Sequence, residues 1–146
     1  MNALRTLILI ALTLTLTSCS TAYNRAWKNF EDPTPADAFT GKWKGTWTST
    51  YNGHTGGLRA MITRQEGDGY LARFHATYAK VLQFSHHNTF TATRKGEQIL
   101  FEGENDLGKL AGGIYKYKGT VEGDHFDSTY VAETDHGNFI MDRVAK

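Results

Sequence analysis

The segment from Gly41 to Tyr51 constrains the fold most, because its side chains alternate strictly in character. Trp43, Trp47 and Tyr51 fall on one face of an extended chain, with small residues between them, while lysine and threonine side chains fall on the other face. A period of two residues is typical of a strand with one buried and one solvated face. The sequence therefore predicts a half-buried β-strand over residues 41–51.

Similar short runs recur between turn residues along the rest of the chain, and no long segment keeps the 3.6-residue apolar repeat of a helix. The expected strands cover residues 41–51, 57–65, 70–78, 89–93, 97–103, 113–121, 126–132 and 139–143, with a loop or bulge at 80–88. Consecutive strands joined by short turns favour an all-β, eight-stranded antiparallel up-and-down barrel. Closing such a barrel pairs the eighth strand with the first and removes both exposed edges.

The first eighteen residues have the anatomy of a signal peptide. Arg5 supplies a positive n-region, and residues 7–16 form an apolar h-region that is too short to span a membrane as a helix. We therefore expect residues 1–18 to be a signal peptide, 19–37 a lipidated N-terminus and flexible tether, and 38–146 the barrel domain.

The balance of charge excludes one class of partner. Removal of residues 1–18 takes away one basic residue, so the 16 Lys and Arg residues become 15 and balance the 15 acidic ones. The charges are spread along the chain without a basic run, so no cluster of basic residues predicts nucleic-acid binding.

Residues 16–19, Leu-Thr-Ser-Cys, resemble the lipobox of bacterial lipoproteins. The resemblance implies that Cys19 becomes the first mature residue and carries diacylglycerol on its sulfur and an acyl chain on its amine. Several acyl chains anchor a protein far more stably than one. Ser20 stands where many proteins retained at the inner membrane have aspartate, so the resemblance implies an outer-membrane lipoprotein on the periplasmic side. A lone cysteine without a disulfide partner agrees with lipidation.

The barrel domain resembles the lipocalins and their calycin relatives, which are eight-stranded up-and-down barrels with a Gly-x-Trp motif at the start of the first strand. Gly41-Lys42-Trp43 matches that motif. The resemblance implies that a short helix over residues 36–39 closes one end of the barrel and that Arg143 packs across Trp43. The chain departs from the family in its short strands, in having no disulfide, and in lacking a C-terminal helix.

Large aromatic and small side chains alternate on the inward face, which leaves two interpretations open. The rings fill the narrow interior of an eight-stranded barrel, or they line a pocket for a small apolar or amphipathic ligand. Buried tyrosine hydroxyls need hydrogen-bond partners, and this favours a pocket. The candidate pocket residues are Trp47, Tyr51, Phe74, Tyr78, Tyr115, Tyr117 and Tyr130.

Polar residues gather in the loops at the barrel end that is expected to lie away from the tether. The candidates at this mouth are His54, Asp106, Asp135 and His136. Imidazole and carboxylate groups suit metal binding and acid–base chemistry, but polar loop side chains are also simply solvated. Neither a metal-ligand spacing nor a Gly-x-Ser-x-Gly elbow is present. The sequence therefore predicts no metal, no cofactor and no catalytic residue.

Together these features predict a lipid-anchored envelope protein whose small barrel acts as a binding module and is not an enzyme. A small apolar ligand is the first expectation for its partner. Two alternatives remain open: a module that binds an envelope protein, for example as an inhibitor of a cell-wall hydrolase, and a metal-dependent enzyme.

Overall fold

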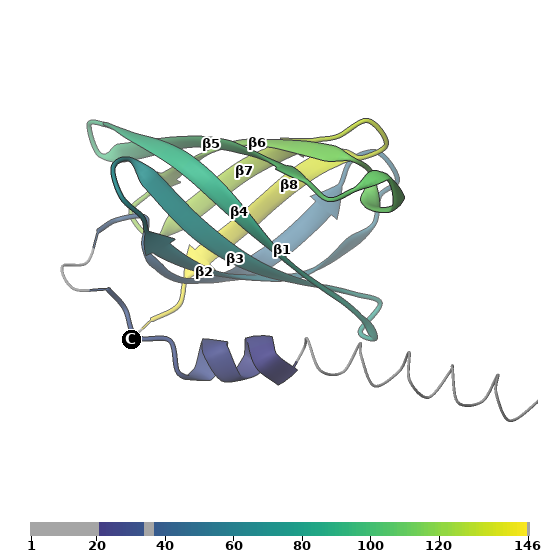
Figure 1. The fold of residues 1–146 in the computed structure, drawn as a ribbon, viewed down its shortest axis with the longest axis horizontal. Coiled ribbons are helices and arrows are strands. Elements are labelled where there is room, and N and C mark those ends of the chain that lie inside the picture. The colour runs from purple at the N-terminus through teal and green to yellow at the C-terminus, as the bar shows by residue number, and fades with distance from the viewer. Residues whose placement is uncertain (1–20, 34–36, 146) are drawn as a thin grey trace, which may run out of the picture.

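Eight strands form a closed antiparallel barrel in which each strand pairs with its neighbours in sequence and β8 pairs with β1 (Figure 1). The computed structural model describes residues 21–33 and 37–145, so the predicted signal peptide and Cys19 lie outside the described residues. The strands are β1 (Gly41–Ser49), β2 (Thr55–Arg64), β3 (Gly69–Tyr78), β4 (Leu82–Lys95), β5 (Gln98–Asp106), β6 (Ile114–Glu122), β7 (His125–Val131) and β8 (His136–Arg143). The predicted all-β up-and-down barrel is confirmed.

The fourth strand is longer than the sequence pattern predicted. Residues 82–88 were expected as a loop or bulge, yet β4 runs without interruption and pairs with β3 from Leu82 to Thr91. The prediction was wrong because two polar residues, His86 and Asn88, occupy inward positions where an apolar side chain was expected. A two-residue period is present here, but its buried face is not apolar.

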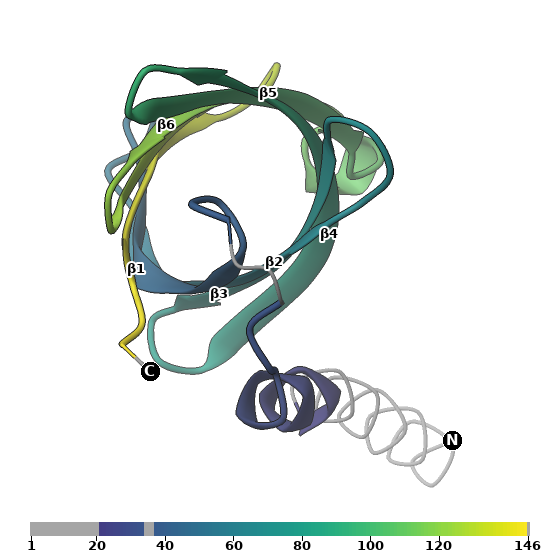
Figure 2. The same cartoon turned by 90° about the vertical axis from the view of Figure 1, so that its left-hand side faces the viewer.

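One end of the barrel is closed by the segment that leads into β1. Phe39 is fully buried, and its ring packs against Tyr70 and Phe101 with centroids 4.8 Å from each. A carboxylate oxygen of Asp37 accepts hydrogen bonds from the backbone N–H groups of Phe39 and Thr40, both at 2.8 Å. Figure 2 looks along the barrel from this end and shows the segment inside the ring of strands. The described part, residues 37–40, forms a bend instead of the expected helical turn.

The closing segment, residues 37–40, is called the plug below. The Arg143 guanidinium contacts both the plug and the first strand from its position on the last strand. It lies 4.3 Å from the ring centroid of the fully buried Trp43, as the lipocalin resemblance implied. Its Nη1 and Nη2 donate hydrogen bonds of 2.6 Å to the carbonyls of Thr40 and Ala38. Gly41 has a φ of 120°, and a Cβ at this position would lie 2.9 Å from Arg143 Nη1. The glycine of the motif therefore leaves room for the arginine.

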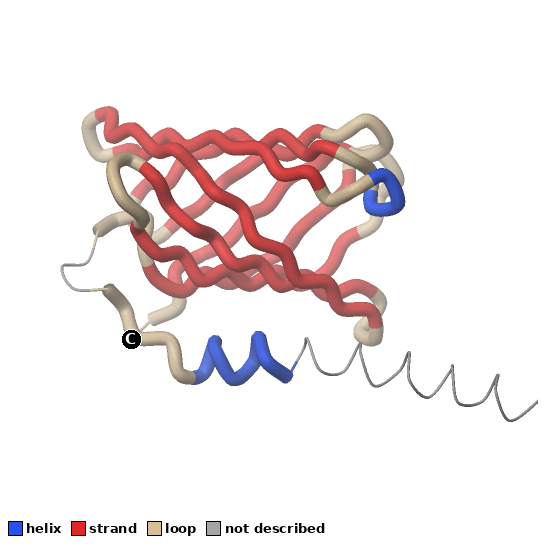
Figure 3. The backbone as a smooth tube through the Cα atoms, viewed as in Figure 1, coloured by secondary structure: helices blue, strands red, loops and turns tan. Residues whose placement is uncertain are grey.

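A helix over residues 21–28 packs on the outside of the barrel, as the blue segment below the strands in Figure 3 shows. Tyr23 stacks on His75 with ring centroids 4.6 Å apart, and its hydroxyl donates to the carbonyl of Arg73. The Arg59 guanidinium lies 5.2 Å from the rings of both Tyr23 and Trp27. We expected residues 19–37 to be a flexible tether, and that prediction did not include this docked helix.

The burial of the strand residues beneath the helix agrees with its docking. Met61 and His75 point outward by strand parity, yet only 1% and 2% of their surfaces are exposed. Side chains on the outer face of a barrel are buried only where another part of the protein covers them. Among the described residues, no helix has both the length and the apolar character needed to cross a membrane.

Removal of either Arg143 or Trp43 should destabilise the barrel strongly. We expect Trp43→Ala to lower the free energy of unfolding by about 3–5 kcal/mol, because it leaves a cavity in the core. Arg143→Ala should lower it by about 2–4 kcal/mol, because it leaves two carbonyls without their hydrogen-bond donor. A double-mutant cycle measured by chemical denaturation should give a coupling above about 0.5 kcal/mol. Arg25→Ala, at an exposed helix position, is the matched control. Additive effects of the two substitutions would contradict the contact.

Candidate functional site

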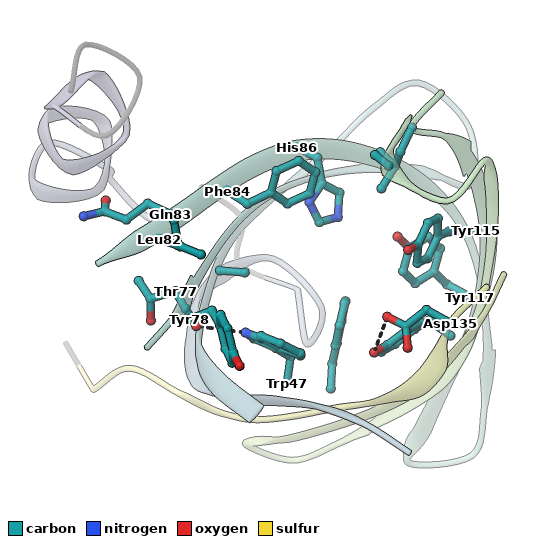
Figure 4. Close-up of a pocket in the computed structure, with 15 residues that line it drawn as sticks. Trp47, Thr77, Tyr78, Leu82, Gln83, Phe84, His86, Tyr115, Tyr117 and Asp135 are labelled. Atoms are coloured by element: carbon teal, nitrogen blue, oxygen red, sulfur yellow. Dashed lines mark hydrogen bonds between the residues drawn. The ribbon is translucent and has the colours of Figure 1, made fainter. Parts of the chain in front are cut away.

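The other end of the barrel is open and contains an aromatic pocket. Up-and-down topology places the β1–β2, β3–β4, β5–β6 and β7–β8 connections at this end, which we call the mouth. A cavity of about 210 Å³ lies there, and Figure 4 shows the side chains that surround it. The lining residues are Trp47, Ala76, Thr77, Tyr78, Leu82, Gln83, Phe84, His86, Leu107, Ala111, Tyr115, Tyr117, Tyr130, Asp135 and Phe139.

One wall of the pocket is a fixed pair of aromatic rings. The indole N–H of Trp47 donates a 3.0 Å hydrogen bond to the carbonyl of Thr77, which holds the ring in place. Tyr78 lies against it, with ring centroids 5.9 Å apart, and the His54 ring lies 4.9 Å from that of Tyr78. Because its indole donor is already bonded to protein, Trp47 offers a ligand an aromatic surface and not a polar contact.

The opposite wall carries tyrosine hydroxyls and a carboxylate. Asp135 accepts a 2.6 Å hydrogen bond from the Ser49 hydroxyl and a 3.3 Å hydrogen bond from the Tyr130 hydroxyl. Tyr115 lies 5.9 Å from Tyr130 between ring centroids, and 6.3 Å from Tyr117. Burial raises the pKa of Tyr115 and Tyr130, and the charge of Asp135 raises both further. Both hydroxyls therefore stay protonated at neutral pH, and that of Tyr130 already donates its proton to Asp135.

Phe74 and Phe139 lie at the base of the pocket, with ring centroids 5.5 Å apart. Phe139 lines the cavity directly, whereas Phe74 is fully buried beneath it and supports the His86 ring at 5.2 Å. Below this level the interior is filled by the rings of the closed end. The two interpretations of the inward face therefore hold in different halves of the barrel: the closed half is packed, and the mouth half contains the cavity.

His86 is an unusual group in the pocket wall. Both ring nitrogens are buried and have no hydrogen-bond partner among the residues that the structure describes. Burial lowers the pKa of His86 to about 4, and the neighbouring His87 lowers it as well. The imidazole is therefore neutral at pH 7, with one nitrogen able to donate and the other able to accept. Buried polar atoms without protein partners are usually satisfied by water or a ligand.

The lining contains no lysine or arginine. The charged side chain that faces the cavity is Asp135, and burial raises the pKa of Tyr117 to about 12, which keeps that hydroxyl neutral as well. An anion entering the pocket would lose its hydration without gaining a cationic partner. The electrostatics of the site thus oppose a carboxylate and permit a neutral or positively charged group.

The structure places the predicted pocket residues in three positions. Trp47, Tyr78, Tyr115, Tyr117 and Tyr130 line the cavity. Phe74 lies below it in the core, and Tyr51 lies outside it in the β1–β2 loop, exposed and in edge contact with His136. Tyr51 shares its parity with Trp47, but β1 ends at Ser49, and the turn carries the side chain away from the interior.

The four predicted mouth residues do not form a cluster. Asp135 reaches the pocket, while His136 bonds the Thr50 hydroxyl at 2.7 Å on the outer surface. His54 stacks on Tyr78, and Asp106 accepts a hydrogen bond from the backbone of Gly108 within its own loop. No group of three or more metal-ligating side chains occurs in the described part of the chain.

The first half of β4 contributes pocket residues outside the predicted set, His86 and Phe84 among them. A signal for them was present, because Leu82, Phe84, His86, Asn88 and Phe90 alternate with outward residues. A strand whose inward face mixes rings and polar groups is the pattern expected of a pocket wall.

Comparisons with known proteins find solved structures with low similarity to this chain. The barrel is similar to two variants of the fluorescent protein UnaG, with 11% and 10% sequence identity and a TM-score of 0.41 in each case. The matches cover 75% and 74% of this chain and 98% and 97% of the two UnaG chains. A scan against protein families and a search of curated proteins find no match. What the pocket binds must therefore be inferred from its own residues.

The buried His86 should make the barrel less stable in acid. The unfolded chain takes up the histidine proton as the pH falls below 6.5, whereas the folded chain does so only near pH 4. Between these values the protein should lose about 3 kcal/mol of unfolding free energy through this one group. Chemical denaturation at pH 7 and pH 4 should show a smaller loss for His86→Phe than for the wild type.

His87→Phe is the matched control, because His87 is the neighbouring residue on the exposed face of the same strand. It should keep most of the pH dependence of the wild type, because burial, the larger cause of the low His86 pKa, is unchanged. Equal acid sensitivity in the wild type and His86→Phe would show that this imidazole is not held neutral by burial.

Proposed function

We propose that the protein is a lipid-anchored binding module of the cell envelope that holds a small aromatic ligand in the mouth of its barrel. The observation that carries the proposal is the open cavity between the Trp47–Tyr78 wall and the tyrosine wall. Preformed concave sites lined by rings, with a few polar groups converging on them, are typical of small-molecule binding. Fixed aromatic side chains also lose little entropy when a ligand enters.

The size of the cavity limits the ligand. A volume of about 210 Å³ exceeds the roughly 150 Å³ that an apolar cavity needs for one benzene ring. It lies below the roughly 300–1,000 Å³ of pockets for drug-sized molecules. The interior therefore suits one or two rings, with any longer substituent projecting through the mouth. A whole acyl chain would not fit, which narrows the sequence-based expectation of a small apolar or amphipathic ligand.

The charges of the pocket side chains restrict the chemical class of the ligand further. Asp135 and the faces of Trp47 and Tyr130 offer a protonated amine both a counter-charge and cation–π contacts. The neutral His86 offers a hydrogen-bond donor or acceptor to a polar substituent on the ring. We therefore infer a neutral or amine-bearing aromatic ligand in preference to a fatty acid or another carboxylate.

A matched pair of aromatic probes tests the pocket. Naphthylmethylamine should quench Trp47 emission and saturate near one equivalent per chain, while naphthoate, with a similar ring system and the opposite charge, should bind at least about tenfold more weakly, a difference of 1.4 kcal/mol. Ala76→Trp should abolish the binding without unfolding the protein, because Ala76 lines the cavity and an indole there would fill it.

Ala22→Trp adds the same side chain at an exposed position of the helix and should leave binding unchanged. Trp47→Phe identifies the emitting ring. If the mouth is already filled, the wild type will show no saturable binding, and Ala76→Trp will instead cost about 1–3 kcal/mol of stability by overpacking. That pair of results would reject the ligand-binding proposal.

The anchor is tested separately from the pocket. Cys19→Ser should prevent acylation, shift the mass of the mature chain by the loss of its acyl groups, and release the protein from the membrane fraction. The expectation follows from the lipobox-like residues 16–19. A wild-type chain that is exported without added lipid mass would overturn this part of the proposal and leave the pocket untouched.

A further inference from the structure

The mouth of the barrel is ringed by exposed apolar side chains. Tyr51, Val81, Leu82, Phe84, Leu110 and Ile114 are all large hydrophobic residues with more than a third of their surface exposed, and we call them the apolar rim. They come from three different connections or the strand ends beside them. Leu110 is fully exposed and Val81 is 76% exposed.

This distribution is one-sided. In the part of the chain that the structure describes, the other exposed large hydrophobic residues are Val131, also at the mouth end of its strand, and Leu100 in the middle of β5. Scattered apolar residues are normal on a protein surface, but a group gathered around an opening marks an interaction site. The rim is therefore a docking surface, and what it docks on must be found from its surroundings.

The direction of the N-terminal helix indicates what the apolar rim docks on. Trp27 lies beside Lys42 at the closed end, with the Lys42 amine 5.8 Å from its ring centroid. Tyr23, one turn earlier, stacks on His75, which strand pairing places two residues further toward the mouth. The helix thus runs backward along the barrel, and its purple N-terminal end points to the side where the β3–β4 turn and η1 (Lys109–Ala111) lie (Figure 1).

The expected tether joins the barrel at the closed end through residues 37–40, but the helix within it carries the chain back toward the mouth. Cys19 is two residues before Thr21, so covalent geometry alone keeps its Cα within about 8 Å of the Thr21 Cα. Acyl chains attached at Cys19 would enter the bilayer on the mouth side of the molecule. We propose that the apolar rim rests on the surface of the lipid bilayer that holds the anchor, so that the pocket opens onto the membrane interface.

The chemistry of the rim suits a lipid surface. Leucine, valine, isoleucine and aromatic side chains are those that enter the headgroup boundary of interfacial proteins. In the four connections at the mouth, Lys80 and Lys109 balance Glu133 and Asp135. Apolar contact, not charge, therefore carries the docking, and binding should depend only weakly on salt. A ligand dissolved in the interface would reach the pocket without crossing water.

The proposal rests on the proposed lipid anchor, and site-specific labelling tests the two separately. Cys19 is the only cysteine, and its sulfur is blocked if it is acylated. Leu82→Cys and Leu110→Cys in the full lipidated chain then accept an environment-sensitive fluorophore at the rim, while Glu97→Cys accepts it at the β4–β5 turn of the closed end. The labelled chains are reconstituted into vesicles of phosphatidylethanolamine and phosphatidylglycerol that contain a spin-labelled lipid.

We expect the two rim labels to shift to shorter emission wavelengths and to be quenched several-fold more than the label at position 97. Strong quenching at position 97, or equal weak quenching at all three, would overturn the proposal. A rim signal that appears without lipid and grows with protein concentration would assign the rim to a second copy of the chain and overturn it as well.

If the wild-type Cys19 reacts with the fluorophore, the anchor is absent; the labels are then placed in a Cys19→Ser background, and added vesicles still decide whether the rim binds lipid. In that case a blue shift at positions 82 and 110 upholds the docking, and no shift rejects it. Leu110→Asp should weaken the quenching at position 82, because it places a charge in the contact. Leu100→Asp, on the barrel wall, is its control and should have no effect.

Discussion

The contact between Arg143 and Trp43 is the interaction on which the rest of the barrel depends. One guanidinium covers the buried indole at the start of β1 and donates to the carbonyls of Ala38 and Thr40. It therefore joins the last strand, the first strand and the plug in a single set of contacts. Without it, the seam between β1 and β8 and the segment that carries Phe39 into the interior would lose a common support.

Closure of one end determines where the free space lies. Phe39 and the rings around it fill the closed half of the barrel. The cavity therefore lies toward the mouth, where Trp47 and the tyrosines line it. This half also holds two polar groups that face the cavity, His86 and Asp135. The packed half supplies stability, and the mouth half is left to bind. The two demands are met in separate parts of one narrow interior.

Strict alternation around Trp43 and the recurring short runs were enough to predict eight antiparallel strands and their closure, because a two-residue period has one structural meaning. The pairing of Trp43 with Arg143 was implied by a family resemblance. The first half of β4 was missed, since His86 occupies an inward position in place of an apolar residue. The segment expected as a tether also contains a helix whose Tyr23 is buried and whose Trp27 is half-buried by contacts with residues far along the chain.

The sequence by itself determined the strand periods, the inward face and the barrel class, because these follow from side-chain spacing within short segments. Only the tertiary structure decided which inward rings fill the core and which line a cavity. That choice depends on how side chains from different strands meet, as Phe74 and Tyr78 on the same face of β3 show. It also decided that the helix runs back toward the mouth, because its direction is fixed by Tyr23 on His75 and Trp27 beside Lys42, contacts between residues distant in sequence.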